Sequence, residues 1–185
     1  MNDEMLIEKR ISGEKRFEGK IVDIECDSAL LPDGKTAYRE VVRKIHNGVC
    51  VVPLTDDGNV VIVRQYRYPY AEILPEAPAG KSEKGESPEE CAVRELSEET
   101  GYTAEKLIPL GEFYPSPGIM DEVLYLYAAT GLTKGQTHPD EDEFVEASLV
   151  PLEKMVEQIM NGEIRDGKTQ TAILKTYLKK QRGEL

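Results

Sequence analysis

Alternating apolar and polar positions predict β-strands over the first 45 residues. The segments "FEGKIVDIECDSALL" and "TAYREVVRK" flank "PDGK", a sequence typical of a hairpin turn. A sheet of this size buries little apolar surface by itself. We therefore predict that residues 1–45 form a small N-terminal antiparallel β-sheet, which packs on the rest of the chain or on a second copy.

Residues 46–185 combine strand patterns with helix patterns, and we predict that they form a second domain. The run "YPYAEILPEAPAG" holds three prolines and is expected to be a loop or an irregular edge strand. An acidic loop is expected before the last strand. The strands are predicted at "VCVVPL" and "VVIVRQYRY", which the turn "DDGN" separates, and at "KLIPLGEFY", "EVLYLYAAT" and "FVEASLVPL".

One predicted helix has clear signals at both ends. Ser87 and Glu90 form an S-x-x-E capping box, Pro88 occupies the favoured first helical position, and Gly101 closes the helix. Ala92 and Leu96 are expected to face inward, with Val93 beside them. Two closing helices are predicted from the apolar positions Leu152, Met155, Val156 and Ile159 and from "TQTAILKTYLKKQ". Mixed strands with helices on either side indicate an α+β fold with α/β/α layers.

The negative charge of the chain is concentrated in two places. The formal net charge is −12 over 185 residues, and residues 83–99 and 140–146 contribute −5 each. Such a balance argues against a nucleic-acid surface, where positive charge must meet phosphate. It suits a site that collects divalent cations. The alternative, a merely soluble acidic protein, does not explain two dense clusters.

The few sulfur and imidazole side chains exclude other chemistry. The three cysteines, Cys26, Cys50 and Cys91, have no C-x-x-C spacing, and His46 and His138 are the only histidines. A zinc site or a histidine-based triad is therefore not expected, and free thiols indicate a reducing compartment. The sequence shows no signal peptide and no apolar stretch approaching 18 residues. We expect a cytoplasmic protein without a membrane partner.

The first capped helix places like charges together. Glu95 and Glu99 are four residues apart and Glu98 lies beside them, although like charges at this spacing repel. We infer that a cation binds there rather than that the glutamates are structural. The full pattern, G-x5-E-x7-R-E-U-x-E-E-x-G-U with U an apolar residue, runs from Gly80 to Tyr102. It resembles the Nudix box of the Nudix hydrolases, with Tyr102 standing where an aliphatic residue is more common.

This resemblance implies a Nudix α/β/α sandwich with a mixed sheet and a metal site. Glu95 and Glu99 resemble the principal metal ligands, Glu98 and Glu86 auxiliary ones, and the carbonyl of Ala79 a further ligand. Oxygen ligands of this kind suit Mg²⁺, with Mn²⁺ as a substitute. Arg94 and Glu98 are both expected to take part in catalysis, and Arg94 is expected to do so by holding a neighbouring carboxylate in place. Its alternative role is an ordinary pair with Glu90 or Glu98.

Segments outside the box resemble the ADP-ribose pyrophosphatase subgroup. "RQYRYPYAEILPEAPAGK" is similar to the segment before the box in that subgroup, although Ala77 replaces a larger apolar residue. Pro117, 16 residues beyond Gly101, matches a proline that marks the subgroup; the alternative is an ordinary turn proline. By the same resemblance Arg67 contacts substrate phosphate. The remaining substrate-binding candidates are Arg64, which could instead be a solvated strand residue, and the acid Glu122.

The loop "PDEDEFVE" resembles the loop that supplies a general base in the family. Glu141 is the expected base and Glu143 an additional metal ligand; the alternative is a solvated acidic loop. Some Nudix enzymes take the base from the box helix instead, which here would be Glu98 or Glu99.

The resemblance implies Mg²⁺-dependent hydrolysis of ADP-ribose to AMP and ribose 5-phosphate by a homodimer paired through residues 1–45. Its substrate partner is a small nucleoside diphosphate sugar. Three alternatives stay open: the same chemistry on another such sugar, for example GDP-mannose; a non-catalytic nucleotide-binding regulator; and a Nudix-fold isomerase of isoprenoid diphosphates. The intact "RELSEE" argues against the regulator. The isomerase would need a reactive cysteine, whereas Cys91 is expected in the core.

Overall fold

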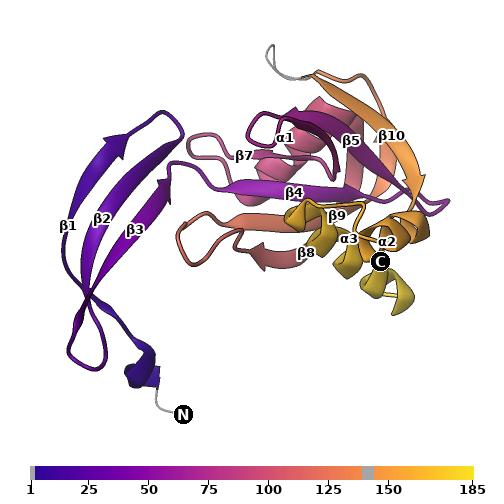
Figure 1. Ribbon diagram of the computed structural model, residues 1–185. Helices are drawn as coiled ribbons and strands as arrows, with labels where there is room; N and C mark the ends of the chain where they lie inside the picture. The colour runs from indigo at the N-terminus through magenta and orange to yellow at the C-terminus, as the bar shows by residue number, and fades with distance from the viewer. Residues whose placement is uncertain (1–2, 139–143) are drawn as a thin grey trace. The chain divides into compact units, whose positions relative to one another are not determined.

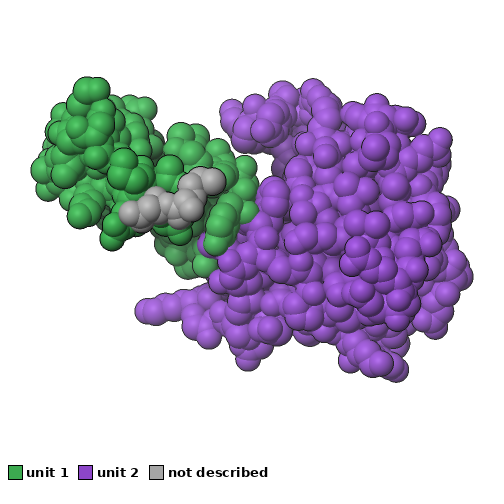
Figure 2. Space-filling view, turned by 90° about the horizontal axis from the view of Figure 1, so that it is seen from below, with its two compact units in different colours: residues 1–47, 114–122 green, residues 48–113, 123–185 purple. Residues whose placement is uncertain are grey.

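A computed structural model describes residues 3–138 and 144–185 (Figure 1). The chain divides into two compact units, coloured green and purple in Figure 2. Unit 1 comprises residues 1–47 and 114–122, and unit 2 comprises residues 48–113 and 123–185. Unit 1 is therefore built from two separate stretches of the sequence.

Unit 1 contains the predicted N-terminal antiparallel sheet, with strand order β1-β2-β3. The turn predicted at "PDGK" joins β2 to β3, and Gly34 adopts a φ of 85° in it. The predicted segment "FEGKIVDIECDSALL" is not one continuous strand. Phe17 belongs to β1, and a turn follows in which the Gly19 N–H donates to the Val22 carbonyl (3.1 Å). The elements are the 3-10 helix η1 (Asp3–Leu6), β1 (Lys9–Glu18), β2 (Val22–Leu30) and β3 (Thr36–Lys44).

Residues 114–122 contact the β3 edge of this sheet, with one isolated bridge between Val42 and Met120. The Val42 N–H donates to the Ile119 carbonyl (2.7 Å), and the Lys44 N–H donates to the Asp121 carboxylate (2.8 Å). Arg43 Nη1 lies 3.2 Å from the same carboxylate. Ala29 is the single buried apolar residue among those described in unit 1, so this unit has almost no core of its own.

Unit 2 contains two sheets. The four-stranded sheet has the order β7-β4-β9-β8 and is mixed, because β4 and β9 are parallel; the three-stranded sheet has the order β10-β5-β6. The two segments around "DDGN" are strands as predicted, but they lie in different sheets. The strands are β4 (Gly48–Pro53), β5 (Asn59–Arg67), β6 (Glu72–Glu76), β7 (Ala79–Lys81), β8 (Tyr102–Phe113), β9 (Leu124–Lys134) and β10 (Val145–Pro151).

The proline-rich segment before the capped helix forms β6 and β7, each at the edge of its sheet. Pro75 is tolerated in β6 because an edge strand can leave one side of its backbone unpaired. Pro78 then separates the two strands. The expectation of an irregular edge strand is therefore confirmed, and the segment connects the two sheets of unit 2.

Helices cover both faces of the four-stranded sheet, as Figure 1 shows: α1 (Pro88–Thr100) on one side, α2 (Leu152–Met160) and α3 (Gly167–Gln181) on the other. Alternate residues of β4 explain these layers. Val49 and Val51 pack with α1, whereas Cys50 and Val52 pack with α2 and α3. The predicted α+β fold with an α/β/α sandwich is confirmed. Within the described residues, no helix is long and apolar enough to cross a membrane.

Candidate active site

The ends of α1 form as its sequence predicts. Ser87 Oγ accepts from the Glu90 N–H (3.2 Å), and the Glu90 carboxylate accepts from the Ser87 N–H (2.9 Å). Pro88 begins the helix, and Gly101 ends it with a φ of 72° and an N–H bonded to the Ser97 carbonyl. These caps fix where the helix begins and ends.

The inward face of α1 differs from the prediction at one position. Ala92 and Leu96 are fully buried as predicted, but Val93, which was expected beside them, is 48% exposed. A residue one step from Ala92 is turned about 100° around the helix and faces away from the sheet. Two glutamates share the buried side instead: Glu95 is 7% exposed and Glu99 is 2% exposed.

The backbone of β7 lies against these buried carboxylates. The Ala79 N–H donates to Glu99 Oε2 (3.0 Å). At Gly80, an added Cβ would lie 1.9 Å from the carboxylate of Glu95, so a residue with a side chain fits there only if this carboxylate moves. The first glycine of the box therefore leaves room for the buried Glu95 side chain.

Arg94 gathers the other carboxylates of the box. Its Nε and Nη2 donate to Glu86 (2.8 and 3.0 Å), and its Nη1 donates to Glu95 (2.9 Å) and Glu98 (2.8 Å). The guanidinium of Arg94 lowers the pKa of Glu86 to about 2. The same hydrogen bonds raise the pKa of Arg94 above its ordinary value. The pair with Glu98 at i,i+4 is thus one contact among several, and the geometry suits a residue that holds metal-binding carboxylates.

The group around Arg94 retains two net negative charges, since one guanidinium faces three carboxylates. Together with the neighbouring Glu99 and the carbonyl of Ala79, it provides the oxygen donors that a hard divalent cation prefers. Within the described part of the chain, no three acidic, cysteine or histidine side chains form a ready-made cage for an ion. The donors fit such a cation chemically, and three of them are turned toward Arg94.

Arg67 binds a residue that the sequence did not single out. Its Nε and Nη2 each donate to the Glu76 carboxylate at 2.7 Å, and Lys168 binds the same carboxylate. No local pattern points to this cluster, because Glu76 and Lys168 are 92 residues apart. Arg64 is exposed and contacts Glu146 at 3.3 Å. Phosphate binding by either arginine stays a prediction.

The remaining candidates belong to unit 1 or fall outside the described residues. Pro117 and Glu122 belong to unit 1, where the Glu122 carboxylate lies 3.2 Å from Lys44 Nζ. Glu141 and Glu143 lie outside the described residues, so their roles as base and ligand stay predictions.

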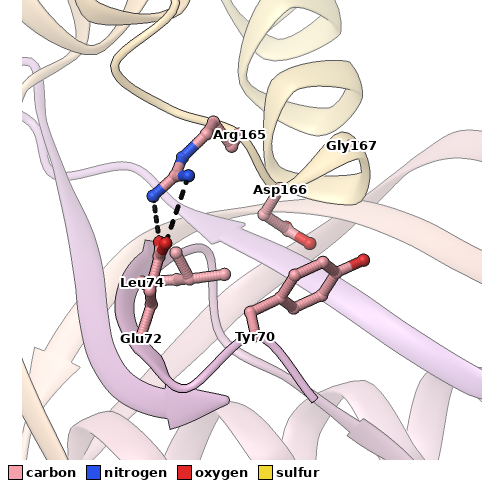
Figure 3. A pocket seen from close by; sticks show the side chains of 6 residues that line it. All are labelled: Tyr70, Glu72, Leu74, Arg165, Asp166 and Gly167. Carbon is pink, nitrogen blue, oxygen red and sulfur yellow. Dashed lines mark hydrogen bonds and ion pairs between the residues drawn. The ribbon is translucent and has the colours of Figure 1, made fainter. Parts of the chain in front are cut away.

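A cavity of about 190 Å³ opens between β6 and the start of α3 (Figure 3). Arg165 points to Glu72 across its rim, and Tyr70 lies beside Asp166. The other lining residues are Leu74 and Gly167. The cavity therefore borders the junction that joins Glu76 to Lys168.

The comparisons with known proteins agree with this geometry. Residues 44–170 match the family model described as NUDIX domain. A crystal structure described as an ADP compounds hydrolase shares the fold with a TM-score of 0.85 at 20% identity, covering 96% of this chain and 97% of that one. The chain belongs to the Nudix family and is a Nudix hydrolase.

Curated relatives are similar over nearly the whole chain. An ADP-ribose pyrophosphatase of Bacillus subtilis (strain 168) is 44% identical over 177 residues, which is 94% of this chain and 95% of the relative. A methanol dehydrogenase activator of Bacillus methanolicus is 43% identical over 90% of each chain. An ADP-ribose pyrophosphatase of Mycobacterium tuberculosis is 34% identical over 83% of this chain and 75% of the relative.

Proposed function

We propose that this chain hydrolyses the pyrophosphate bond of ADP-ribose and releases AMP and ribose 5-phosphate. The observation that carries the proposal is the 44% identity to an ADP-ribose pyrophosphatase over 94% of this chain. The complete box on α1 supports it, because its buried carboxylates lie against the backbone of β7.

The metal in this proposal is Mg²⁺, with Mn²⁺ as a substitute. Glu95, Glu99 and the carbonyl of Ala79 hold it, and Glu86 and Glu98 assist. When bound, the metal supplies charge neutralisation at the pyrophosphate and a more acidic water. Before it binds, Arg94 holds Glu86, Glu95 and Glu98 in place, which limits the like-charge repulsion among them.

The proposed substrate-binding residues are those that the resemblance to the family assigns. Arg67, with Arg64, contacts phosphate through the fork geometry that suits phosphoryl oxygens. Glu122 and Pro117 contribute on the substrate side. Glu141 accepts the proton of the attacking water, and Glu143 adds a metal ligand.

We further propose a homodimer paired through the β1–β3 sheet. The support is the exposure of large apolar side chains on a unit with almost no core. These side chains are Ile11, Phe17, Ile21, Leu30 and Tyr38. The proposed location is the cytoplasm, which suits three cysteines that are all free.

A substrate panel tests the function. The purified protein, with Mg²⁺, is given ADP-ribose, ADP-glucose, GDP-mannose, NADH and diadenosine polyphosphates, and kcat/KM is ranked. We expect ADP-ribose to rank first, with activity lost on chelation and restored by Mg²⁺. A tenfold preference for GDP-mannose or a diadenosine compound would contradict the proposal.

A second candidate is activation of a methanol dehydrogenase, which the 43% identity to an activator of that name favours. It is compatible with hydrolysis. Adding the protein to a methanol dehydrogenase assay, with and without the Glu99→Gln substitution, tests whether it activates and whether activation needs the proposed metal site.

A further inference from the structure

Two cations share one buried carboxylate beside the proposed phosphate contact. Glu76, at the end of β6, is 1% exposed. Arg67 donates to both of its oxygens at 2.7 Å, and the Lys168 ammonium binds one of the same oxygens. Lys168 also lies 3.0 Å from Asp166. The negative charge of Glu76 is thus balanced by two cations from different elements, Arg67 of β5 and Lys168 of α3.

The two cations differ in their access to solvent. The side chain of Arg67 is 36% exposed, whereas that of Lys168 is 13% exposed and that of Glu76 is 2% exposed. Arg67 therefore has one side open to solvent, from which a ligand can approach it. Lys168 is held inside the fold.

The start of α3 is fastened to the strand that carries Glu76. Asp166 caps the helix by accepting from the Thr169 N–H (2.9 Å), and Thr169 Oγ1 accepts from the Ala77 N–H (2.8 Å). Lys168 lies between Asp166 and Thr169 in the sequence. Its ammonium is consequently placed on Glu76 by the backbone of α3 as well as by charge.

Electrostatics make the second cation important. Burial raises the pKa of Glu76, but the hydrogen bonds and charges of Arg67 and Lys168 outweigh burial and bring that pKa below its ordinary value. Removing the cation from a buried carboxylate leaves an uncompensated charge, which is strongly unfavourable. If Arg67 were the only partner, turning toward substrate would carry that cost.

We propose that Lys168 is a positioning residue: it keeps the buried Glu76 charge-balanced, so that Arg67 can exchange this carboxylate for a phosphate of the substrate. The inference rests on the proposed function, because it takes Arg67 as a phosphate contact. Lys168 touches neither the substrate nor the metal. It acts through Glu76 and Arg67.

Kinetics test the coupling to substrate. Lys168→Met removes the charge and keeps a long side chain, Lys168→Arg restores a cation, and Arg165→Met removes a neighbouring cation that pairs with the exposed Glu72. With ADP-ribose and saturating Mg²⁺, we expect Lys168→Met to raise KM about tenfold or more and to change kcat less than threefold, since binding alone weakens. Lys168→Arg and Arg165→Met should keep KM within threefold of the wild type.

Thermal unfolding of the ligand-free protein tests the shared carboxylate without any turnover. Either cation alone should support Glu76, so Arg67→Met and Lys168→Met are each expected to lower Tm by a few degrees at most. The double variant should lower Tm by clearly more than the two losses added together, because it leaves Glu76 with neither partner.

The outcomes separate the inference from the proposed function. An unchanged KM for Lys168→Met, or additive losses of Tm, overturns the inference while hydrolysis of ADP-ribose stands. An unchanged KM for Arg67→Met overturns both the inference and the phosphate role of Arg67. A wild-type protein that does not hydrolyse ADP-ribose overturns the proposed function and the substrate part of the inference, and the unfolding cycle then reports on the carboxylate alone.

Discussion

At the scale of single residues, the carboxylates of α1 have two different environments. Glu99 accepts from the backbone of β7, whereas Glu98 and Glu86, which precedes the helix, are bound by Arg94. Glu95 has both environments, because it is buried next to the strand and also accepts from Arg94. Separate experiments can therefore test the charge of the metal ligands, the packing of Gly80 against Glu95, and the identity of the general base.

The first prediction concerns the proposed metal ligands. Glu95→Gln and Glu99→Gln keep size but remove charge, and we expect kcat/KM to fall by about two orders of magnitude or more, as when a major electrostatic stabiliser is lost. Tm without metal should hold or rise, because repulsion is relieved. Glu157→Gln, an exposed acid on α2, is the matched control and should retain full activity. Normal turnover in both box variants would mean that these carboxylates are not ligands.

The second prediction concerns Gly80. Gly80→Ala places a methyl group 1.9 Å from the Glu95 carboxylate, so this buried carboxylate must move from its position. We expect a loss of about 1–3 kcal/mol in the free energy of unfolding, together with a large loss of activity. At Gly167 an added Cβ meets only Phe113 at 3.5 Å, so Gly167→Ala is the control. Chemical denaturation and kcat measure both variants; equal stability of the two would contradict the close approach.

The third prediction separates the base from the ligand in the acidic loop. A base acts in the chemical step, so Glu141→Gln should lower kcat about 100-fold or more with KM changed only a few-fold. Glu143→Gln should instead raise the Mg²⁺ concentration needed for half-maximal rate. Asp140→Asn and Asp142→Asn are the controls and should have small effects. If Glu98→Gln loses kcat while Glu141→Gln keeps it, the base is on α1.

At the scale of elements, local sequence signals predicted the ends of α1, whereas the pairing of strands far apart in the sequence was not predicted. Ser87, Pro88 and Gly101 act within a few residues of themselves, so the helix ends could be read directly. The partition of β4 and β5 into different sheets depends on β9, which pairs with β4 from more than 70 residues away, and no local pattern encodes that choice. Spacing alone therefore predicted the two strands and the turn between them, but not the sheets to which they belong.

The same distinction applies to the site. The carboxylates around Arg94 lie within the box spacing, so their grouping could be predicted. The contact of Glu76 with Lys168 joins β6 to α3, and the contact of Ala77 with Thr169 joins the same elements. Both need the sandwich to be assembled first. The sequence alone presents Lys168 as one of many surface-type lysines.

The fourth prediction tests the helix cap. Ser87→Ala removes the acceptor for the Glu90 N–H, and we expect a loss of about 1 kcal/mol in the free energy of unfolding. The carboxylates lie two turns further along the helix, so kcat should change less than threefold. Urea denaturation measures the first quantity and steady-state kinetics the second. An unchanged stability would mean that the cap contributes nothing in solution.

At the scale of the whole molecule, the fifth prediction is a homodimer paired through unit 1. Apolar side chains without a core favour association with a second copy. Sedimentation at micromolar concentration should give twice the chain mass of 20.7 kDa. Deleting residues 1–45 should impair folding as well as substrate binding. A fully active monomer at that concentration would refute the proposal.

The composition of unit 1 from residues 1–47 and 114–122 has a consequence for how this protein changes over evolution. Arg43 and Lys44 contact Asp121, so two stretches far apart in the gene meet in one sheet. A substitution at a contact residue of one stretch is therefore expected to require a compensating substitution in the other. Across relatives, the charges at positions 43 and 121 should covary. The N-terminal segment is thus not a detachable module, and grafting it onto another hydrolase requires residues 114–122 as well.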